Sequence, residues 1–392
     1  MTEIKKVAII GAGTMGSSIA AALIAKNYPV LLKESSETFL AKGLTTIDSI
    51  LKKGVEKGKV SPQDAITQRG LVTGTLDYAN FFDIDLVIEA VPEQVEIKKS
   101  VLKDLNDHCK ESAIIASNTS SMSISQLGSF SSRPAKTIGM HFFNPAHLMR
   151  LVEIIPGLET DQETIDTVID FATKLGKLAV RVDECASFLV NRLLGRYMNE
   201  SLWCLEEGIA SQDEIDQKTC EYNMPVGPLA LRDMNGADIG LWVAKYNQSE
   251  YGPRFEVPPL LESMVKANYL GKKTKKGFYI YDDQGAKIGP NSDLAQFVKP
   301  ATSGDFKAER LFLPMINEAF LALQENVCRK EDLDKALCAG LGMRKGPLAL
   351  ANEMGLSLCL MLMEENFQKH GERYRPAPLL KRYVFAGRET ID

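Results

Sequence analysis

The sequence predicts an α/β domain with a mostly parallel sheet, followed by two tandem all-α domains that are similar to one another. Three observations lead to this prediction. Short apolar runs alternate with amphipathic helical patterns over the first 182 residues, a glycine-rich turn follows the first run, and helical patterns dominate and repeat from residue 188 onward. Continuous apolar strands joined by helical crossovers are typical of a parallel sheet that is covered on both faces.

The composition is that of a globular protein and excludes several classes of function. Apolar residues make up 45% of the chain, and the net charge of −5 leaves no domain-wide basic excess for binding nucleic acid. No apolar run reaches the ~18–20 residues that span a membrane. The seven cysteines are scattered and never spaced C-x-x-C. This pattern favours a reducing, cytoplasmic location and argues against a disulfide framework or a cysteine-rich metal site.

Each predicted element follows from the periodicity of its apolar residues. The runs with strand character are residues 6–10, 30–33, 71–73, 86–90, 113–116, 137–140, 149–155 and 178–182. The helical patterns between them include residues 15–26, 96–110 and 162–175. We interpret the apolar start of the chain as a first strand rather than a signal peptide, because glycines interrupt it.

Two changes in composition divide the chain into domains. The first lies near residues 184–187, where strand patterns give way to helical ones, and it predicts domains over residues 1–185 and 186–284. The second is the polar stretch 285–307, whose glycines and prolines are typical of a linker. Beyond it, residues 308–392 form the second helical domain, which we expect to be structural.

The two helical domains share a sequence pattern. Asn199-Glu200 recurs 118 positions later as Asn317-Glu318, and the string G-P-L-A-L at residues 227–231 recurs 119 positions later at residues 346–350. Amphipathic helices share apolar positions by chance, but a whole G-P-L-A-L string in register does not readily arise that way. The repeat predicts a duplicated helical module, and two copies are too few for a solenoid, so we expect them to pack as a pair.

A glycine-rich turn, Gly11-Ala-Gly13-Thr14-Met15-Gly16, joins the first predicted strand to the first predicted helix. In a Rossmann-type dinucleotide fold the first glycine makes the tight turn and the second lets the backbone approach the pyrophosphate. The third lets helix and strand pack closely. The helix N-terminus offers unpaired N–H groups to the phosphates. The motif alone is weak, because it also occurs in plain turns and leaves FAD as an alternative.

An acidic residue at the end of the second predicted strand strengthens this interpretation. Glu34 follows Gly16 by 18 residues and is placed to accept hydrogen bonds from the adenosine ribose hydroxyls. Its charge would repel a 2′-phosphate, so the sequence favours NAD over NADP. The neighbouring Lys33, Ser35 and Ser36 leave NADP as an open alternative.

Hydride transfer from an alcohol requires a base for the hydroxyl proton, and His141 is the histidine best placed to act as one. It closes an apolar strand in I-G-M-H-F-F-N-P, and ligands bind at the carboxyl ends of strands in open α/β sheets. A turn at Asn144-Pro145 predicts that the next strand returns beside it, which would bring Glu153 to His141 to fix the imidazole tautomer. The alternatives are a structural histidine and a glutamate that points to solvent from an edge strand.

These motifs together resemble the 3-hydroxyacyl-CoA dehydrogenase family. The resemblance rests on GAGTMG, Glu34, IEAVPE ending at Glu93, the S-N-T-S-S loop that begins at Ser117, HFFNPAHLMRLVE and FLVNRLL. It extends over residues 4–282, and residues 309–384 are similar to the family's C-terminal helical domain. The duplicated helical domain looks most like the dehydrogenase part of multifunctional fatty-acid oxidation enzymes, without the hydratase domain that those enzymes carry.

The resemblance implies a role for each matched residue. The general base would be His141, oriented by Glu153, while Ser120 and Asn191 would hold the C3 oxygen of the substrate. Further contacts with NAD are implied for Glu93, Lys98, Asn144 and Lys273. The implied reaction is the reversible oxidation of an L-3-hydroxyacyl-CoA thioester to 3-ketoacyl-CoA with formation of NADH, as in the β-oxidation of fatty acids, and it requires no metal.

The sequence departs from the family pattern at two places. Ala186-Ser187 stands where the family usually has Pro-Gly before F-L-V-N-R, which predicts a less rigid connection between domains. Glu309 takes the place of Asn191 in the second helical copy, so we expect one active site per chain.

Several readings of function and assembly stay open at this point. A related dehydrogenase that acts on a free hydroxy acid and a non-catalytic NAD-binding module are the alternatives to an acyl-CoA enzyme. Two-domain relatives commonly dimerise through the helical domain, and the second copy could fill that surface within one chain. Both a monomer and a homodimer therefore remain open, as does docking of a hydratase or a thiolase.

Overall fold

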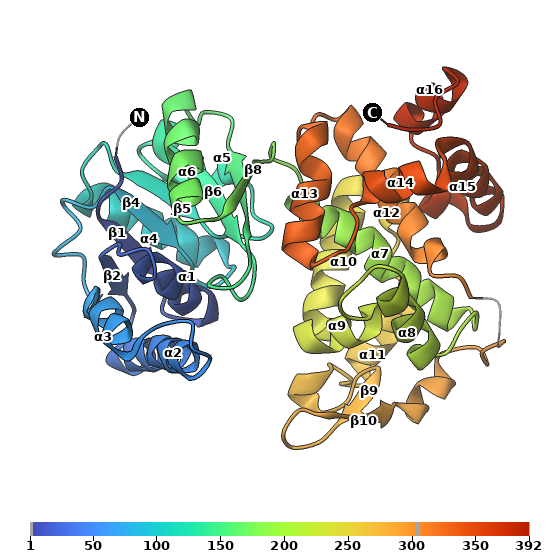
Figure 1. The fold of residues 1–392 in the computed structure, drawn as a ribbon, viewed down its shortest axis with the longest axis horizontal. Helices are drawn as coiled ribbons and strands as arrows, with labels where there is room; N and C mark the ends of the chain where they lie inside the picture. Colours follow the sequence, from blue (N-terminus) through green and yellow to red (C-terminus); the bar gives the residue numbers. More distant parts are fainter. Residues whose placement is uncertain (1–2, 303–305, 392) are drawn as a thin grey trace. The chain divides into compact units, whose positions relative to one another are not determined.

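The computed structural model describes residues 3–302 and 306–391, and the chain divides into two compact units, Met1–Phe188 and Leu189–Asp392 (Figure 1). Among the described residues, the first unit contains an eight-stranded sheet of order β3-β2-β1-β4-β5-β6-β7-β8. Its strands are β1 Val7–Ile10, β2 Val30–Lys33, β3 Val72–Thr75, β4 Leu86–Glu89, β5 Ile114–Ser117, β6 Thr137–Phe142, β7 Leu151–Pro156 and β8 Leu178–Arg181. Every predicted strand overlaps an observed one, with ends that differ by at most two residues.

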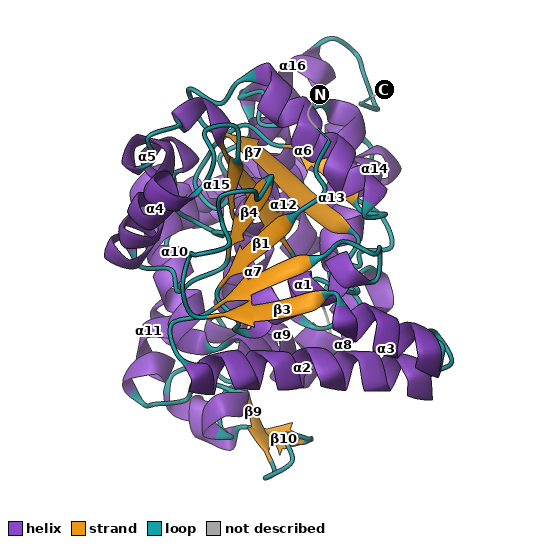
Figure 2. Cartoon of the chain, turned by 90° about the vertical axis from the view of Figure 1, so that its left-hand side faces the viewer, coloured by secondary structure: helices purple, strands orange, loops and turns teal. Residues whose placement is uncertain are grey.

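All neighbouring strands of this sheet are parallel except β6 and β7, which are antiparallel. The mostly parallel, Rossmann-like sheet predicted from the sequence is therefore confirmed. Figure 2 shows the strands side by side with helices around them. The helices of this unit are α1 Thr14–Ile24, α2 Glu37–Glu56, α3 Pro62–Gly70, α4 Val95–His108, α5 Ile124–Phe130, η1 Pro134–Lys136 and α6 Gln162–Lys174.

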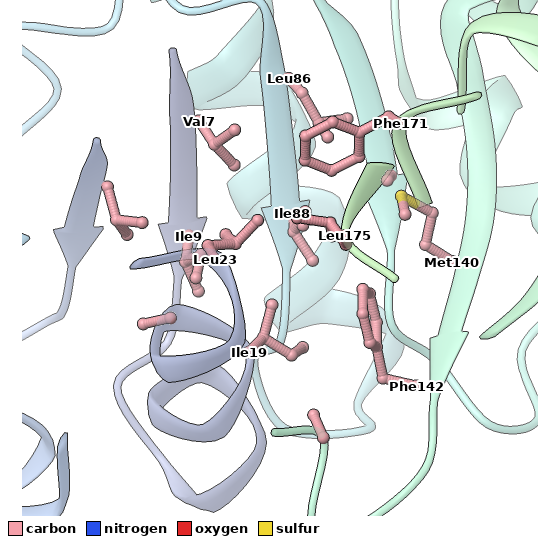
Figure 3. Packing of buried hydrophobic residues seen from close by; sticks show 14 of the residues in the cluster. Val7, Ile9, Ile19, Leu23, Leu86, Ile88, Met140, Phe142, Phe171 and Leu175 are labelled. Carbon is pink, nitrogen blue, oxygen red and sulfur yellow. The ribbon is translucent and has the colours of Figure 1, made fainter. Parts of the chain in front are cut away.

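One face of the sheet forms the hydrophobic core of the first unit. Alternate residues of the strands, such as Ile9 and Ile88, pack there against side chains of α1, α2 and α6, including Ile19 and Phe171 (Figure 3). Because side chains alternate across a strand, the residues between these positions belong to the other face. That other face carries the polar side chains of the candidate site described below.

In its described residues the second unit is helical apart from one short antiparallel hairpin, β9 Tyr279–Tyr281 and β10 Lys287–Pro290. Its first helices are α7 Phe188–Glu206, α8 Gln212–Tyr222, α9 Pro228–Asn235, α10 Ala237–Tyr251, η2 Gly252–Phe255, α11 Pro259–Lys266 and η3 Lys272–Thr274. They are followed by η4 Ser292–Gln296, α12 Glu309–Gln324, α13 Lys330–Leu341, α14 Pro347–Met354, α15 Leu356–His370, η5 Gly371–Tyr374 and α16 Pro378–Phe385. In the described part of the chain, no helix combines the length and the apolar stretch that crossing a bilayer requires.

The hairpin was not predicted, and its second strand lies within residues 285–307, for which the sequence predicts a linker. This segment contains β10 and the 3₁₀ turn η4, while its residues 303–305 lie outside the described part of the chain. Two features hide the hairpin from periodicity. The strand β9 has only three residues, and its pairing with β10 shifts register between Lys287 and Gly289.

The repeated G-P-L-A-L string forms the same structure at both places. In each copy it begins a short helix, and an aspartate accepts hydrogen bonds from the first backbone N–H groups of that helix. Asp216 accepts from Leu229 N and Ala230 N at 2.9 Å, and Asp334 accepts from the equivalent N–H groups at the same distance. A Cβ atom at Gly227 would lie 2.2 Å from the Asp216 carboxyl carbon, so only glycine leaves room for this helix cap.

Buried ion pairs join the first set of these helices to the second, and they are reciprocal. Arg192 pairs with Glu318 at 2.7 Å, while Arg310, which lies 118 positions after Arg192, pairs with Glu200 at 3.1 Å, 118 positions before Glu318. Arg192 also pairs with Glu325 at 2.7 Å, and Arg310 pairs with Glu207 at 3.0 Å. Such an exchange of equivalent contacts is the pattern of a two-fold interface.

Candidate active site

The glycine turn between β1 and α1 has the geometry that its motif predicts. Gly11 has a φ of +99°, and a Cβ there would lie 2.7 Å from the Ala90 carbonyl oxygen. A Cβ at Gly16 would lie 1.8 Å from the Gly11 carbonyl oxygen, so the helix packs too closely on the turn for any side chain. Gly13, in contrast, has no atom within 4 Å of its Cβ position and is exposed. The open space at Gly13 fits close approach of a ligand to the backbone.

Gly13 is also the N-cap residue of α1, and no side chain caps this helix. Thr14 and Met15 form its first turn, with Thr14 exposed and Met15 partly buried. The first backbone N–H groups of a helix lack partners within the helix and attract an anion such as a pyrophosphate. The residues present at this turn therefore fit a dinucleotide.

Glu34 lies beside the glycine turn, directly after β2. Its carboxylate accepts hydrogen bonds from Ala12 N at 2.8 Å and from Ser35 N at 2.6 Å. Burial favours the neutral acid, but these hydrogen bonds hold the pKa of Glu34 below its ordinary value, so the group is anionic at neutral pH. An anion at the end of β2 is suited to accept hydrogen bonds from ribose hydroxyls and repels an added phosphate.

His141 and Glu153 are partners across the antiparallel pair β6 and β7, and their side chains meet. Nδ1 of His141 lies 2.7 Å from Oε2 of Glu153, and both side chains are almost fully buried. On the other side of the ring, Nε2 lies 3.0 Å from the hydroxyl of Ser120. The rings of Phe143 and Phe188 pack at 4.6 and 5.7 Å from the imidazole. The meeting of His141 with Glu153 that the turn at Asn144-Pro145 suggested is present.

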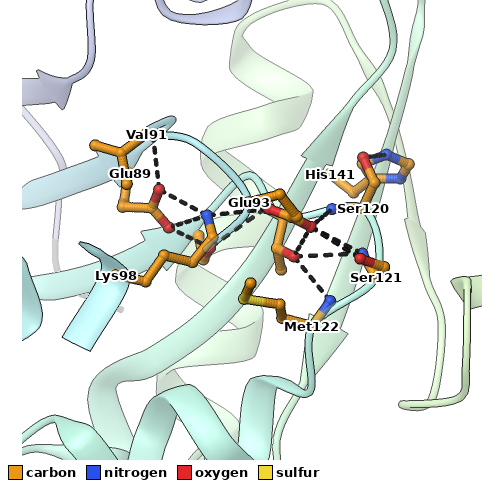
Figure 4. A network of polar contacts seen from close by, with 10 residues as sticks. Glu89, Val91, Glu93, Lys98, Ser120, Ser121, Met122 and His141 are labelled. Atoms are coloured by element: carbon orange, nitrogen blue, oxygen red, sulfur yellow. Dashed lines mark hydrogen bonds and ion pairs between the residues drawn. The ribbon is translucent and has the colours of Figure 1, made fainter. Parts of the chain in front are cut away.

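The loop that carries Ser120 is held by Glu93. Oε1 of Glu93 accepts hydrogen bonds from the backbone N–H groups of Ser120 and Ser121 at 2.9 and 3.2 Å, and from the hydroxyl of Thr119 (Figure 4). Burial favours the neutral acid, but the charge of Lys98 and these hydrogen bonds keep the pKa of Glu93 below its ordinary value. Glu93 therefore acts on the loop as an anion.

A second acidic residue, Glu89, lies at the end of β4. It was not among the site residues predicted from the sequence. Its two carboxylate oxygens each accept a hydrogen bond from Lys98 Nζ at 2.8 Å, and the Lys98 side chain is 1% exposed. Oε2 of Glu93 lies 3.3 Å from the same ammonium group. Figure 4 shows these three side chains leading from β4 toward Ser120 and His141.

The other predicted site residues belong to other elements of the chain. Asn144 is exposed in the turn after β6, where its peptide bond to Pro145 is cis. Asn191 lies on the first turn of α7, and Lys273 lies in η3, where its ammonium pairs with Asp238. Both of these residues belong to the second unit, so their implied contacts with substrate and NAD stay predictions.

Two family models match this chain. The NAD-binding domain of 3-hydroxyacyl-CoA dehydrogenase matches residues 6–185, and the C-terminal domain of the same enzyme matches residues 188–281 and 306–390. The chain belongs to the 3-hydroxyacyl-CoA dehydrogenase family. The resemblance found in the sequence is thereby confirmed, together with the NAD-binding character of the first unit.

Individual relatives support the same family. A fatty acid oxidation complex subunit alpha from Shewanella amazonensis is 35% identical over 98% of this chain, which spans 56% of that protein. The crystal structure of 3-hydroxybutyryl-CoA dehydrogenase from Escherichia coli K12 matches with a TM-score of 0.89 at 27% identity, covering 98% of this chain and 99% of that one. The structure of (S)-3-hydroxybutyryl-CoA dehydrogenase from Ralstonia eutropha is 39% identical and covers 72% of this chain and 100% of that one, with a TM-score of 0.70. The chain thus spans little more than half of the length of the curated relative.

Proposed function

We propose that this chain oxidises L-3-hydroxyacyl-CoA thioesters to 3-ketoacyl-CoA with NAD, and that His141 is the general base. The observation that carries the proposal is the arrangement of Glu153, His141 and Ser120 in one hydrogen-bonded line at 2.7 and 3.0 Å. NAD supplies the hydride acceptor when it is bound. The chain's own residues take the hydroxyl proton, orient the substrate and exclude water.

The hydrogen bonds of His141 determine which nitrogen acts as the base. A carboxylate only accepts hydrogen bonds, so Glu153 requires the proton of the neutral imidazole on Nδ1. Nε2 then carries the lone pair, and it accepts from the Ser120 hydroxyl. A substrate hydroxyl at the position next to Ser120 would give its proton to Nε2, and Glu153 would stabilise the imidazolium that forms. Ser120, together with Asn191, would hold the C3 oxygen during this transfer.

The cofactor roles proposed for the first unit follow from the glycine turn. Gly11, Gly13 and Gly16 with the start of α1 at Thr14 and Met15 would receive the pyrophosphate, and Glu34 would bind the adenosine ribose. Asn144 and Lys273 remain proposed contacts of NAD. The open backbone at Gly13 supports this assignment, because a side chain there would meet no protein atom within 4 Å.

The substrate class is tested by comparing a thioester with the free acid. We expect NADH formation with L-3-hydroxybutyryl-CoA and a kcat/KM at least about a hundredfold lower with free 3-hydroxybutyrate, because remote binding energy from the CoA group is lost. Absorbance at the NADH band measures both rates. Equal rates would support the free-acid dehydrogenase instead, and NADH binding without turnover of either compound would support a non-catalytic module.

We further propose that the helical region is a duplicated module, with one copy over residues 186–284 and the second over residues 308–392, and that the second copy is structural. The reciprocal pairs of Arg192 with Glu318 and of Arg310 with Glu200 support this proposal. So does the match of one family model to two segments. In this arrangement the second copy covers a surface of the first that a second chain would otherwise cover.

This arrangement predicts the state of the chain in solution. We expect sedimentation at micromolar concentration to give the mass of one chain, 43.2 kDa, because the two-fold interface is already satisfied within it. A tight dimer at these concentrations would contradict the proposal. Addition of a hydratase or a thiolase in the same experiment tests whether either enzyme docks. A cytoplasmic location, which the scattered spacing of the seven cysteines favours, is kept as a proposal.

A further inference from the structure

We propose that Arg232 forms a binding site for a carboxylate group in the helical unit. The carboxylate is carried either at the far end of the substrate's acyl chain or by a free acid, and the experiment below separates these two sources. The first source rests on the proposed function. The binding site itself is measured without turnover, so its test does not depend on activity.

Arg232 is a buried cation without a protein partner. It lies on α9, and its side chain is only 8% exposed. Among the residues that the structure describes, no carboxylate pairs with its guanidinium group, and its Nε is buried without a hydrogen-bond acceptor. Burial lowers the pKa of Arg232 to about 10, which is still far above neutral pH, so the group keeps its charge. Because an unpaired buried charge is costly, a stable fold that retains one indicates a place for an anion.

The acids that lie near Arg232 in the sequence are engaged elsewhere. Asp233 accepts hydrogen bonds from two backbone N–H groups at 2.9 Å and from a tyrosine hydroxyl at 3.0 Å. Asp238, at the start of α10, pairs with Lys273. Nζ of Lys273 would lie only 3.1 Å from a Cβ atom at Gly236, the residue after α9. A proposed contact of NAD therefore lies at the end of the helix that carries Arg232.

The next helix leaves the space that the guanidinium group fills. A Cβ atom at Gly240 of α10 would lie 2.1 Å from Nη1 and 2.8 Å from Cζ of Arg232. The guanidinium group is therefore packed directly against the backbone of α10, the helix that follows α9 in the second unit (Figure 1). Glycine at position 240 and arginine at position 232 are matched to one another in size.

The second helical copy closes the same place without a cation. Ala351 directly follows the second G-P-L-A-L string, as Arg232 follows the first, and Cys359 stands 119 positions after Gly240. Ala351 lies on α14 and Cys359 on α15, and both are 0% exposed. A helix pair of this kind therefore packs with two small neutral side chains at these positions. The packing does not require an arginine, which favours a binding role for Arg232.

The surroundings favour a carboxylate over a phosphate. The planar fork of a guanidinium group matches the two oxygens of a carboxylate. The site is nearly closed, and a dianionic phosphate gives up more hydration than a monoanionic carboxylate when it is buried. The two helices also carry Met234, Ile239 and Trp242, each more than half exposed. Apolar side chains on the same helices suit a carboxylate that is attached to a hydrocarbon chain.

The test compares three proteins: the unmodified chain, Arg232→Ala/Gly240→Cys and Arg382→Ala. The double variant carries the pair of residues that the second copy has at these positions, so its folding is preserved. Arg382 is the matched control, because it is an exposed arginine on α16 in the same unit. Urea unfolding is followed by circular dichroism at increasing concentrations of sodium hexanoate, hexanamide or inorganic phosphate, at constant ionic strength. A ligand that binds only the folded chain raises the midpoint of unfolding.

In the unmodified chain we expect hexanoate to raise the midpoint and neutral hexanamide to leave it unchanged. The dissociation constant of hexanoate obtained from this shift should be at least about tenfold larger in the double variant. Without any ligand, the double variant should unfold at the same or a higher urea concentration, because an unpaired buried charge has been removed. The Arg382→Ala variant should match the unmodified chain with every ligand.

A second measurement separates the two sources of the carboxylate. It compares kcat/KM for L-3-hydroxyhexanoyl-CoA with kcat/KM for the analogue in which a carboxyl group replaces the terminal methyl group. If the acyl chain supplies the carboxylate, the preference for the carboxyl analogue should fall at least about thirtyfold in the double variant. An unchanged preference, together with loss of hexanoate binding, supports a site for a free carboxylate.

Three results would overturn the carboxylate site. The first is equal behaviour of the unmodified chain and the double variant with hexanoate and with both thioesters. The second is a lower midpoint of the double variant without ligand and no change in any ligand effect, which would assign Arg232 to packing. The third is tighter binding of phosphate than of hexanoate that is lost in the double variant. If the unmodified chain oxidises neither thioester, the proposed function fails by itself, and the hexanoate titration still decides whether the site exists.

Discussion

Replacing His141 by glutamine is expected to lower kcat at least about a hundredfold, because the side chain that we propose as the base for the hydroxyl proton is lost. Glutamine is similar in length and polar, so it fills the space between Glu153 and Ser120 without leaving a large cavity. The glycine turn and Glu34 do not contact this side chain in any hydrogen bond that the structure shows. The dissociation constant of NADH, measured by fluorescence, should therefore change less than about threefold.

The control for this variant is His108→Gln. His108 lies at the end of α4 and is exposed; its ring hydrogen-bonds to the carbonyl of Asp104 in the preceding turn and stacks on Tyr78. Its replacement should leave both kcat and NADH binding as in the unmodified chain. Comparable kcat in the His141 and His108 variants would remove the general-base role of His141 while leaving the family assignment in place.

The second large effect is on stability. Replacing Glu318 by glutamine should lower the free energy of unfolding of the helical unit by about 3–5 kcal/mol, because it removes the buried carboxylate that Arg192, Arg196 and Arg254 share. Glu318 is 0% exposed and pairs with Arg192 at 2.7 Å and with Arg254 at 3.2 Å, while Arg196 lies 3.8 Å away. Arg192 and Arg196 are themselves buried, so water does not replace the lost carboxylate.

Urea unfolding followed by circular dichroism measures this loss, with Glu353→Gln as the control. Glu353 pairs with Lys345 on the surface of the same region, and both side chains are about half exposed. An exposed pair contributes about 0–1 kcal/mol, so the control should unfold close to the unmodified chain. Equal midpoints for the two variants would show that the contact between the helical copies is not held by Glu318.

The contact of His141 with Glu153 could be predicted because burial limits what a polar residue can do. Glu153 stands among apolar residues in a predicted strand, and a buried carboxylate requires a partner. The turn at Asn144-Pro145 suggested which strand would return, and His141 was the nearby group able to pair. Local patterns of this kind reach across one turn, so the sequence predicts the contact correctly.

The same reasoning applies to Glu89 but was not used for it. Glu89 also closes an apolar strand, in L-V-I-E, and it too lies buried. Resemblance to the family drew attention to Glu93 and Lys98 as cofactor contacts instead. In the structure, Lys98 Nζ lies closer to Glu89 than to Glu93. No spacing in the sequence reveals this partner, because it depends on how α4 packs on the sheet.

The sequence by itself determined the features that depend on neighbours along the chain: the strands of the first unit, the glycine turn, the acid after β2 and the repeated G-P-L-A-L string. Backbone sterics and hydrophobic periodicity act over a few residues, so their effects can be recognised in a single sequence. Apart from the pair of His141 with Glu153, the tertiary structure decided which charges meet in the interior. The pairs of Lys98 with Glu89 and of Arg192 with Glu318 join residues from separate elements. Their energies depend on burial and on atomic distances that exist only after the chain has folded.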